Sequence, residues 1–184
     1  PTKQVEKYLH FHEINFNETV SVGDVHATDI KVNANGVATF RGAVDANSFT
    51  FFDNAAEASF GAINLGVQLD ANAPGNGIAN FDQTIISEDV GADGARLAQA
   101  NFAASESHVN ANIYANAIDL AAGGTITLDG ASTFTGATTT GANSILNLTE
   151  HDITFKGGLV NLGHDTTIKT TVNGANLGNF VAGA

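Results

Sequence analysis

Two short segments carry the residue types of a serine hydrolase: a hydroxyl, an imidazole and a carboxylate. They are Ser105-Glu106-Ser107-His108 and His164-Asp165. In such an enzyme a base takes the serine proton and a carboxylate orients that base. Neither segment has the Gly-x-Ser-x-Gly turn that exposes a nucleophilic serine. Because short matches arise freely in polar repeats, the pattern favours polar surface positions over an acyl-transfer site.

Acidic residues point to a second chemistry, glycosidic bond hydrolysis by paired carboxylates. The candidates are Asp29, Asp45, Glu88 and Asp89. A groove that holds sugars for hydrolysis usually also has aromatic or basic groups, and this chain has no Trp, two Tyr and seven Lys or Arg. A carbohydrate-active enzyme stays open as an alternative, but no catalytic residue is assigned.

Metal binding has weaker support. His10-Phe11-His12 places two imidazoles on one face of a strand, but the sequence supplies no third ligand of the kind that zinc requires. Asp70 to Gly77 resembles half of a calcium loop, with oxygen ligands at Asp70 and Asn72 and a turn at Gly75. The later acid and the final glutamate of such a loop are missing. We expect surface histidines, a plain turn, and no metal or cofactor.

The dominant feature of the chain is a repeat of a small apolar residue, a small polar residue and phenylalanine. Successive Phe residues are 20, 21 and 21 positions apart, read from the residue numbers. Self-similarity at this period is typical of a stacked array in which each unit is too short to bury its apolar face alone. We expect the four rings to form a buried ladder, with the neighbouring Asn amides in a parallel ladder. The four copies are Ala38-Thr39-Phe40, Ala58-Ser59-Phe60, Ala79-Asn80-Phe81 and Ala100-Asn101-Phe102.

Strand-type alternation between Gly, Asn and Asp corners predicts an all-β fold, a right-handed parallel β-helix with rungs of about 20–21 residues. The array is expected over residues 14–184 as one domain of about eight or nine rungs. Residues 1–13 are expected to form a short helical cap, because Val5 and Leu9 lie one helical turn apart. A loop or short helical excursion is expected near Asp89 to Gly94, followed by a strand.

A longer copy indicates that the repeat spans several corners. Val25 to Ala43 reads VHATDIKVNANGVATFRGA, and Ile113 to Ala131, 88 positions later, reads IYANAIDLAAGGTITLDGA. Glycine recurs at Gly36 and Gly124, where the backbone must bend sharply.

The charge of the chain excludes some partners. There are 19 Asp and Glu against 7 Lys and Arg, which gives a net charge of −12. Nucleic-acid binding needs a basic footprint, so that class is disfavoured, as is an anionic membrane surface. No apolar run reaches the length of a membrane-spanning helix, so we expect no membrane insertion by this segment. The chain begins at Pro1 and has no signal-peptide pattern, so we expect a segment of a larger protein.

The C-terminal part resembles the distal passenger of the rickettsial surface cell antigen autotransporters, of the outer-membrane protein A and B type. The resemblance rests on NIYANAIDLAAGGTITLDG, on ILNLTEHDITFKGGLVNLGHDTTIKTTVNGANLGNFVAG and, more weakly, on ANFAASESHVNANIY. It covers well over a third of the chain, while the first hundred residues resemble these passengers only in their general character.

This resemblance implies an exported, non-catalytic β-helical passenger, displayed on the bacterial outer membrane and used to attach to and enter host cells. The implied partner is a host-surface protein or glycan, and self-association is compatible with it. No active-site residues are carried over. A spacer or folding scaffold within a passenger stays open as a third alternative.

Overall fold

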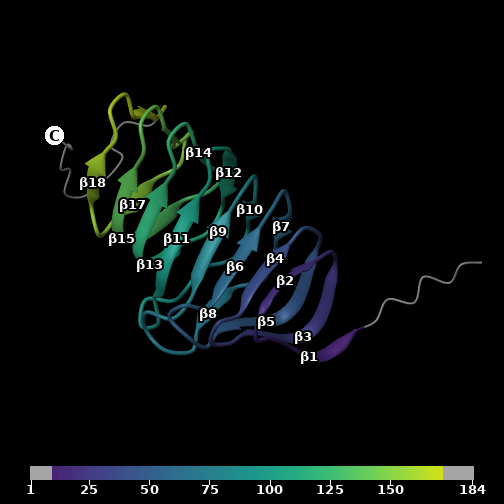
Figure 1. Cartoon of the computed structure of the whole chain (residues 1–184). Helices are drawn as coiled ribbons and strands as arrows, with labels where there is room; N and C mark the ends of the chain where they lie inside the picture. Colours follow the sequence, from purple (N-terminus) through teal and green to yellow (C-terminus); the bar gives the residue numbers. More distant parts are fainter. Residues whose placement is uncertain (1–9, 172–184) are drawn as a thin grey trace, which may run out of the picture.

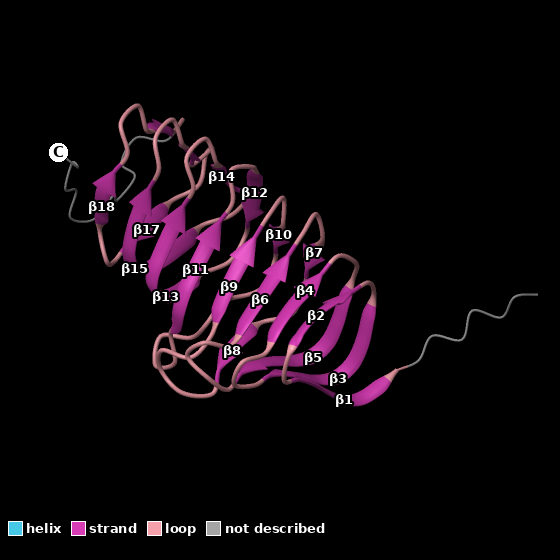
Figure 2. Ribbon diagram, viewed as in Figure 1, coloured by secondary structure: helices cyan, strands magenta, loops and turns pink. Residues whose placement is uncertain are grey.

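The computed structural model describes residues 10–171, and in that range the regular elements are all β-strands. Every pairing between named strands is parallel. The strands stack as a solenoid, so the predicted all-β parallel β-helix is confirmed (Figures 1 and 2).

The solenoid has three faces, which we name by the inward residues that stack along them. Face A carries β2, β4, β6, β9, β11 and β18; face B carries β7, β10, β12, β14, β16 and β19; face C carries β1, β8 and β17. The long strands β3 and β5 run from face B to face C, and β13 and β15 run from face C to face A.

The strand bounds are as follows: β1 Phe11–Phe16, β2 Thr19–Val22, β3 Val25–Val32, β4 Val37–Phe40, β5 Val44–Phe51, β6 Glu57–Phe60, β7 Asn64–Leu65, β8 Leu69–Ala71, β9 Ile78–Phe81, β10 Ile85–Ile86, β11 Leu97–Phe102, β12 Glu106–Val109, β13 Ile113–Leu120, β14 Thr125–Leu128, β15 Ser132–Thr140, β16 Ile145–Asn147, β17 Ile153–Phe155, β18 Leu159–Leu162 and β19 Thr167–Lys169.

Pairing register defines the column of face A, one residue per rung. Its spacings are 18, 20, 21, 21, 18, 20 and 22 residues, read from the residue numbers, so the 20–21 repeat holds strictly between the phenylalanines and relaxes on either side. The column contains Val22, Phe40, Phe60, Phe81, Phe102, Leu120, Thr140 and Leu162.

Faces B and C have equivalent columns, and the interior also contains further buried residues such as Val32, Phe51 and Ala79. In Figure 1 the strands of face A run upward at the front, those of face B lie behind, and the chain advances from right to left, which is a right-handed winding. The face B column is Val25, Val44, Leu65, Ile86, Val109 and Leu128; the face C column is Ile14, Ile30, Phe49, Leu69, Val90, Ile113, Phe134 and Phe155.

The four phenylalanines of face A stack directly on one another. Ring centroids are 5.3 Å apart for Phe40 and Phe60, 5.8 Å for Phe60 and Phe81, and 5.1 Å for Phe81 and Phe102. All four rings are at most 1% exposed. Phe49 of face C packs edge-on against this ladder at 5.5 Å from Phe40 and 5.7 Å from Phe60.

Two expectations concern helical segments. Phe11 and His12, which the sequence placed in the helical cap, belong to strand β1; residues 1–9, like the last part of the array at 172–184, lie outside the described range. The region from Asp89 to Gly94 was expected to be a loop or a short helix, and it is a loop with an isolated bridge at Val90. Strand β11 follows it as expected.

The two copies 88 residues apart turn out to occupy different corners. The first copy, β3 and β4, crosses from face B through face C to face A, whereas the second, β13 and β14, crosses from face C through face A to face B. Each makes the same tight turn, in which Gly36 donates its N–H to the Asn33 carbonyl and Gly124 donates to Ala121. The unit that repeats is therefore strand–corner–strand, and it is not tied to one side of the solenoid.

We predict that Phe81→Ala lowers the free energy of unfolding by about 3–5 kcal/mol, because it removes a buried ring and leaves a cavity between two others. Asp82→Ala is the matched control: its side chain is exposed and should change stability by about 0.5 kcal/mol or less. Chemical denaturation of both variants checks this, and a loss below about 1 kcal/mol for Phe81→Ala would contradict a buried ladder.

A second prediction concerns Gly77, which ends the loop after β8 with a φ of 87°. A Cβ there would lie 2.4 Å from Cγ of Phe51, which is fully buried. Gly77→Ala should lower the free energy of unfolding by about 1–3 kcal/mol. Gly66→Ala is the control because nothing lies within 4 Å of the position that its added methyl carbon would take. Equal thermal stability of the two variants would contradict the tight packing at Gly77.

Candidate binding surface

The serine, histidine and carboxylate candidates do not assemble into a triad. In β12 the side chains alternate, so Ser107 is buried and accepts a hydrogen bond from the Thr84 N–H, while His108 faces outward. His108 Nδ1 lies 3.0 Å from Asp129 and its Nε2 lies 3.7 Å from Glu106. Both imidazole nitrogens of His108 thus lie near carboxylates, and neither is paired with a serine.

The remaining candidates for nucleophilic chemistry are also engaged elsewhere. Ser105 donates to Asp82 at 2.7 Å. His164 lies 3.1 Å from its neighbour Asp165, and both side chains are about three-quarters exposed.

The four candidate carboxylates belong to different hydrogen-bonding groups. Asp29 accepts from Ser48 at 2.6 Å, and Asp45 lies 3.2 Å from His26. Asp89 accepts from the backbone and side chain of Asn112. Glu88 is exposed in the loop before Val90. Each of the three paired carboxylates bonds to a residue of an adjacent rung, an arrangement that stabilises the stack.

The proposed metal ligands do not converge. His10 Nε2 lies 3.2 Å from the Thr28 hydroxyl. Asp70 accepts from Gln68, and Gly75 donates its N–H to the Arg96 carbonyl of the next rung. Within residues 10–171 no group of three or more His, Asp or Glu side chains could hold a metal ion. Asp70 and Ala71 end strand β8, and residues 72–77 form the turn that the sequence favoured.

A charged cluster lies on face C near the N-terminal end of the described chain. Lys31 forms an ion pair with Glu13, and its Nζ lies 5.9 Å from the centroid of the Phe52 ring. The hydrogen bond from Lys31, with a further one from Asn15, lowers the pKa of the Glu13 carboxyl. The cluster links strands β1 and β3, and its groups satisfy one another.

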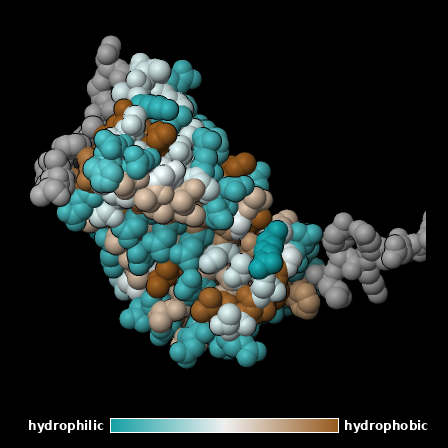
Figure 3. All heavy atoms as spheres, turned by 45° about the horizontal axis from the view of Figure 1, so that its top comes forward, coloured by the Kyte–Doolittle hydropathy of each residue, from teal (hydrophilic) through white to brown (hydrophobic). Residues whose placement is uncertain are grey.

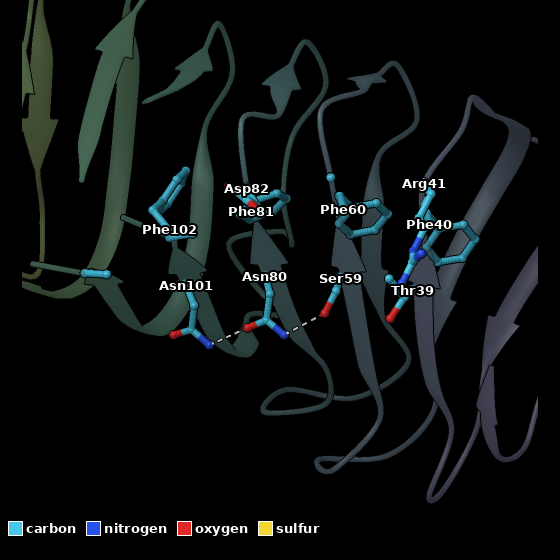
Figure 4. A pocket seen from close by; sticks show the side chains of 13 residues that line it. Thr39, Phe40, Arg41, Ser59, Phe60, Asn80, Phe81, Asp82, Asn101 and Phe102 are labelled. Atoms are coloured by element: carbon cyan, nitrogen blue, oxygen red, sulfur yellow. Dashed lines mark hydrogen bonds between the residues drawn. The ribbon is translucent and has the colours of Figure 1, made fainter. Parts of the chain in front are cut away.

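An open groove of about 540 Å³ lies on the outer surface of face A, and we call it the face A groove. It crosses β4, β6, β9 and β11, and Figure 4 shows its residues. The four phenylalanines of the ladder line the groove together with the polar residue before each of them and the residue after it, and the Phe rings point inward. Two rows of residues line the outside of the groove. The row before the inward column is Thr39, Ser59, Asn80 and Asn101, and the row after it is Arg41, Gly61, Asp82, Ala103 and Ala121.

The polar residues of the groove form the amide ladder that the repeat predicted. Asn101 Nδ2 donates to Asn80 Oδ1 at 2.7 Å, and Asn80 Nδ2 donates to the Ser59 hydroxyl at 3.2 Å (Figure 4). Asn80 also donates to Glu57 at 2.7 Å. These bonds fix both amide orientations, so the groove presents a preorganised row of polar atoms.

The sequence reasoning missed the groove itself. Gly61, Ala103 and Ala121 follow the phenylalanine column and leave space that a larger side chain would fill. Arg41 and Asp82 occupy the same position on other rungs and are exposed. The signal that could have found it is the small residue after Phe60, Phe102 and Leu120.

The face of the molecule seen in Figure 3 is mostly hydrophilic or neutral, with hydrophobic residues among the polar ones. The large exposed apolar side chains in the described range are Phe11, Phe52 and Ile85. They lie on separate strands or turns, and isolated exposed apolar residues are normal on protein surfaces.

Comparison with known proteins gives no relative: no protein-family model matches the chain, and neither curated proteins nor solved structures yield a significant match. Among residues 10–171, no helix is long and apolar enough to cross a membrane.

We predict that Asn80→Ala lowers the free energy of unfolding by about 1–2 kcal/mol, because it removes the central member of the ladder and leaves its partners without their hydrogen bonds. Asn64→Ala, at an exposed position of β7 on face B, should have little effect. Denaturant titration of the two variants measures the difference, and equal midpoints would mean that the ladder contributes nothing to stability.

Proposed function

We propose that this chain is a passenger-type segment displayed on the bacterial cell surface, which attaches to host cells through its outer faces without catalysis. The observation that carries the proposal is the open groove on face A, which five consecutive stacked rungs hold in a fixed geometry. The resemblance of residues 112–184 to rickettsial passengers supports the same function and the same location.

A stacked solenoid suits this task because its surface is long, regular and fixed by the core. The candidate catalytic groups are distributed among separate rungs, where they bond to neighbouring strands. A binding function uses the surface as it stands, whereas a hydrolase would need two carboxylates poised about one bond.

Charge gives this surface a second property. Between Gly42 and Ala95 there are eight Asp and Glu and no Lys or Arg, so the middle of the solenoid is acidic. An acidic exterior attracts a basic receptor patch, and salt screens that attraction once the Debye length falls below about 8 Å.

The test is attachment of coated beads to cultured mammalian cells. Beads carrying this chain should attach more than beads carrying an unrelated β-helix of similar charge. The excess should fall in part as salt rises, because the charge-dependent share is screened. Attachment equal to the control at every salt concentration would contradict the proposal and would leave the spacer or scaffold role.

A further inference from the structure

A lysine, an asparagine and a glutamate meet on the outer side of strands β1 and β3. Asn15 and Lys31 are direct partners in the parallel pairing of these strands, so their side chains leave the sheet next to each other. Glu13 lies two residues before Asn15 on the same face of β1. Its Oε1 accepts a hydrogen bond from the Asn15 amide at 2.5 Å, and its Oε2 accepts one from Lys31. One carboxylate thus holds an amine beside a carboxamide.

The carbonyl oxygen of the Asn15 side chain has a hydrogen-bond donor of its own. Asn33, two residues after Lys31 on β3, donates from Nδ2 to Asn15 Oδ1 at 3.2 Å. A donor at this position stabilises the negative charge that develops on the oxygen when a nucleophile attacks the carbonyl carbon. The nitrogen of the same amide faces Glu13, a group that can carry a proton. The surroundings of Asn15 therefore suit substitution at its Cγ atom.

We propose that Lys31 and Asn15 form an intramolecular amide bond, which links strands β1 and β3 covalently without an enzyme or a cofactor. The neutral Nζ of Lys31 attacks Cγ of Asn15, and the electron pair of the C=O bond moves onto Oδ1. Glu13 takes the proton that Nζ loses and passes it to Nδ2. The bond from Cγ to Nδ2 then breaks, the carbonyl forms again and ammonia leaves. The chain loses one ammonia, and nothing is oxidised or reduced.

The state of the charged groups sets the rate of this reaction. Hydrogen bonds from Lys31 and Asn15 lower the pKa of the Glu13 carboxyl, so Glu13 is present as the carboxylate that can accept a proton. A lysine attacks only as the neutral amine, so the reaction should be slow at neutral pH and faster as pH rises. The neighbouring titratable groups are His12 and Asp29, and Thr50, the partner of Lys31 on β5, is uncharged.

A second lysine and asparagine pair separates the effect of the carboxylate from that of proximity. Asn147 of β16 and Lys169 of β19 are also direct partners in parallel strands. Asn147 donates to the Thr127 hydroxyl at 3.4 Å, and among residues 10–171 no carboxylate is hydrogen-bonded to both members of this pair. If proximity alone were sufficient, both pairs would link. If Glu13 takes part, the pair on β1 and β3 links and the other pair does not.

The position of the link gives it a structural consequence. Strand β1 ends the order of its sheet and pairs with β3 alone among the described strands. An amide bond between Asn15 and Lys31 closes a loop in the chain, and such a closure restricts the unfolded chain and favours the folded one. The inference goes beyond the proposed attachment function and does not depend on it.

The experiment incubates the intact folded chain at neutral and at increasingly alkaline pH and follows its mass. We expect the loss of the mass of one ammonia, at a rate that rises about tenfold per pH unit while most of the lysine is protonated. Proteolysis and tandem mass spectrometry should identify a branched peptide that joins Lys31 to Asn15. The linked chain should also unfold at a higher temperature than the unlinked chain.

The variants test each role separately. Lys31→Arg keeps the positive charge but has no nucleophilic amine, so it should form no link. Glu13→Gln keeps the size of the side chain and removes the base, so the link should form at least about tenfold more slowly. Lys156→Arg, at an exposed position, is the control and should link at the unchanged rate. Asn147 and Lys169 should stay unlinked in every sample, and circular dichroism verifies that each variant is folded.

Four results would overturn the inference: no loss of ammonia from the folded chain, equal linking of Asn147 with Lys169, an unchanged rate in folded Glu13→Gln, or the same rate in chain unfolded with urea. The last of these would show that the fold does not position the reacting groups. Conversion of Asn15 to aspartate in place of the branched peptide would also contradict the inference, because water and not Lys31 would then be the nucleophile.

Discussion

In-register stacking of inward side chains is the constraint on which this structure depends. A parallel solenoid places each inward residue directly above its counterpart one rung earlier, at about 4.8 Å. The Phe81 and Phe102 rings meet at 5.1 Å with a tilt of 34°, whereas Phe60 and Phe81 are nearly parallel at 5.8 Å. The rings therefore shift sideways or tilt to fit the spacing that the backbone hydrogen bonds set. In a column of one residue type, each ring can adopt an orientation close to that of its neighbour.

The side chains of the three faces share the interior, and its composition changes along the axis. Aromatic residues occupy face A from Phe40 to Phe102, and face C then provides Phe134 and Phe155 where face A continues with Thr140. Thr140 forms a hydrogen bond with Thr166 at 2.8 Å. The Oγ1 atom of buried Thr138 has no such partner in the described part of the chain. Aromatic residues thus continue on face C after they end on face A, and polar groups enter the interior at the face A positions that follow.

Sequence alone predicted the features that depend on repetition of residue type. The phenylalanine ladder and the adjacent amide ladder follow from identical residues at one spacing, because parallel register brings them together. The corner assignments did not follow: the copy beginning at Val25 and the copy beginning at Ile113 share their turn chemistry but start on different faces. A corner turn depends on local residues such as Gly36 or Gly124. It therefore does not predict how many residues separate it from the preceding corner, or which corner of the solenoid it forms. Phe11 was open to two interpretations, a strand and the end of a helical cap, and the pairing that decides between them is with a partner in β3 that lies 16 residues away.

The register that orders the core also makes the outer surface periodic, because the position of each outward residue is fixed by the inward residues on either side of it in the strand. Core packing fixes where Ser59, Asn80 and Asn101 lie but places few limits on what they are. The residues after each phenylalanine differ in type from rung to rung, with Arg41, Gly61, Asp82 and Ala103 at equivalent positions. The groove arises from small residues at that position on several rungs, a property that no single repeat displays. On such a scaffold, binding specificity depends on the outward rows, because their residue types vary from rung to rung while their positions stay fixed.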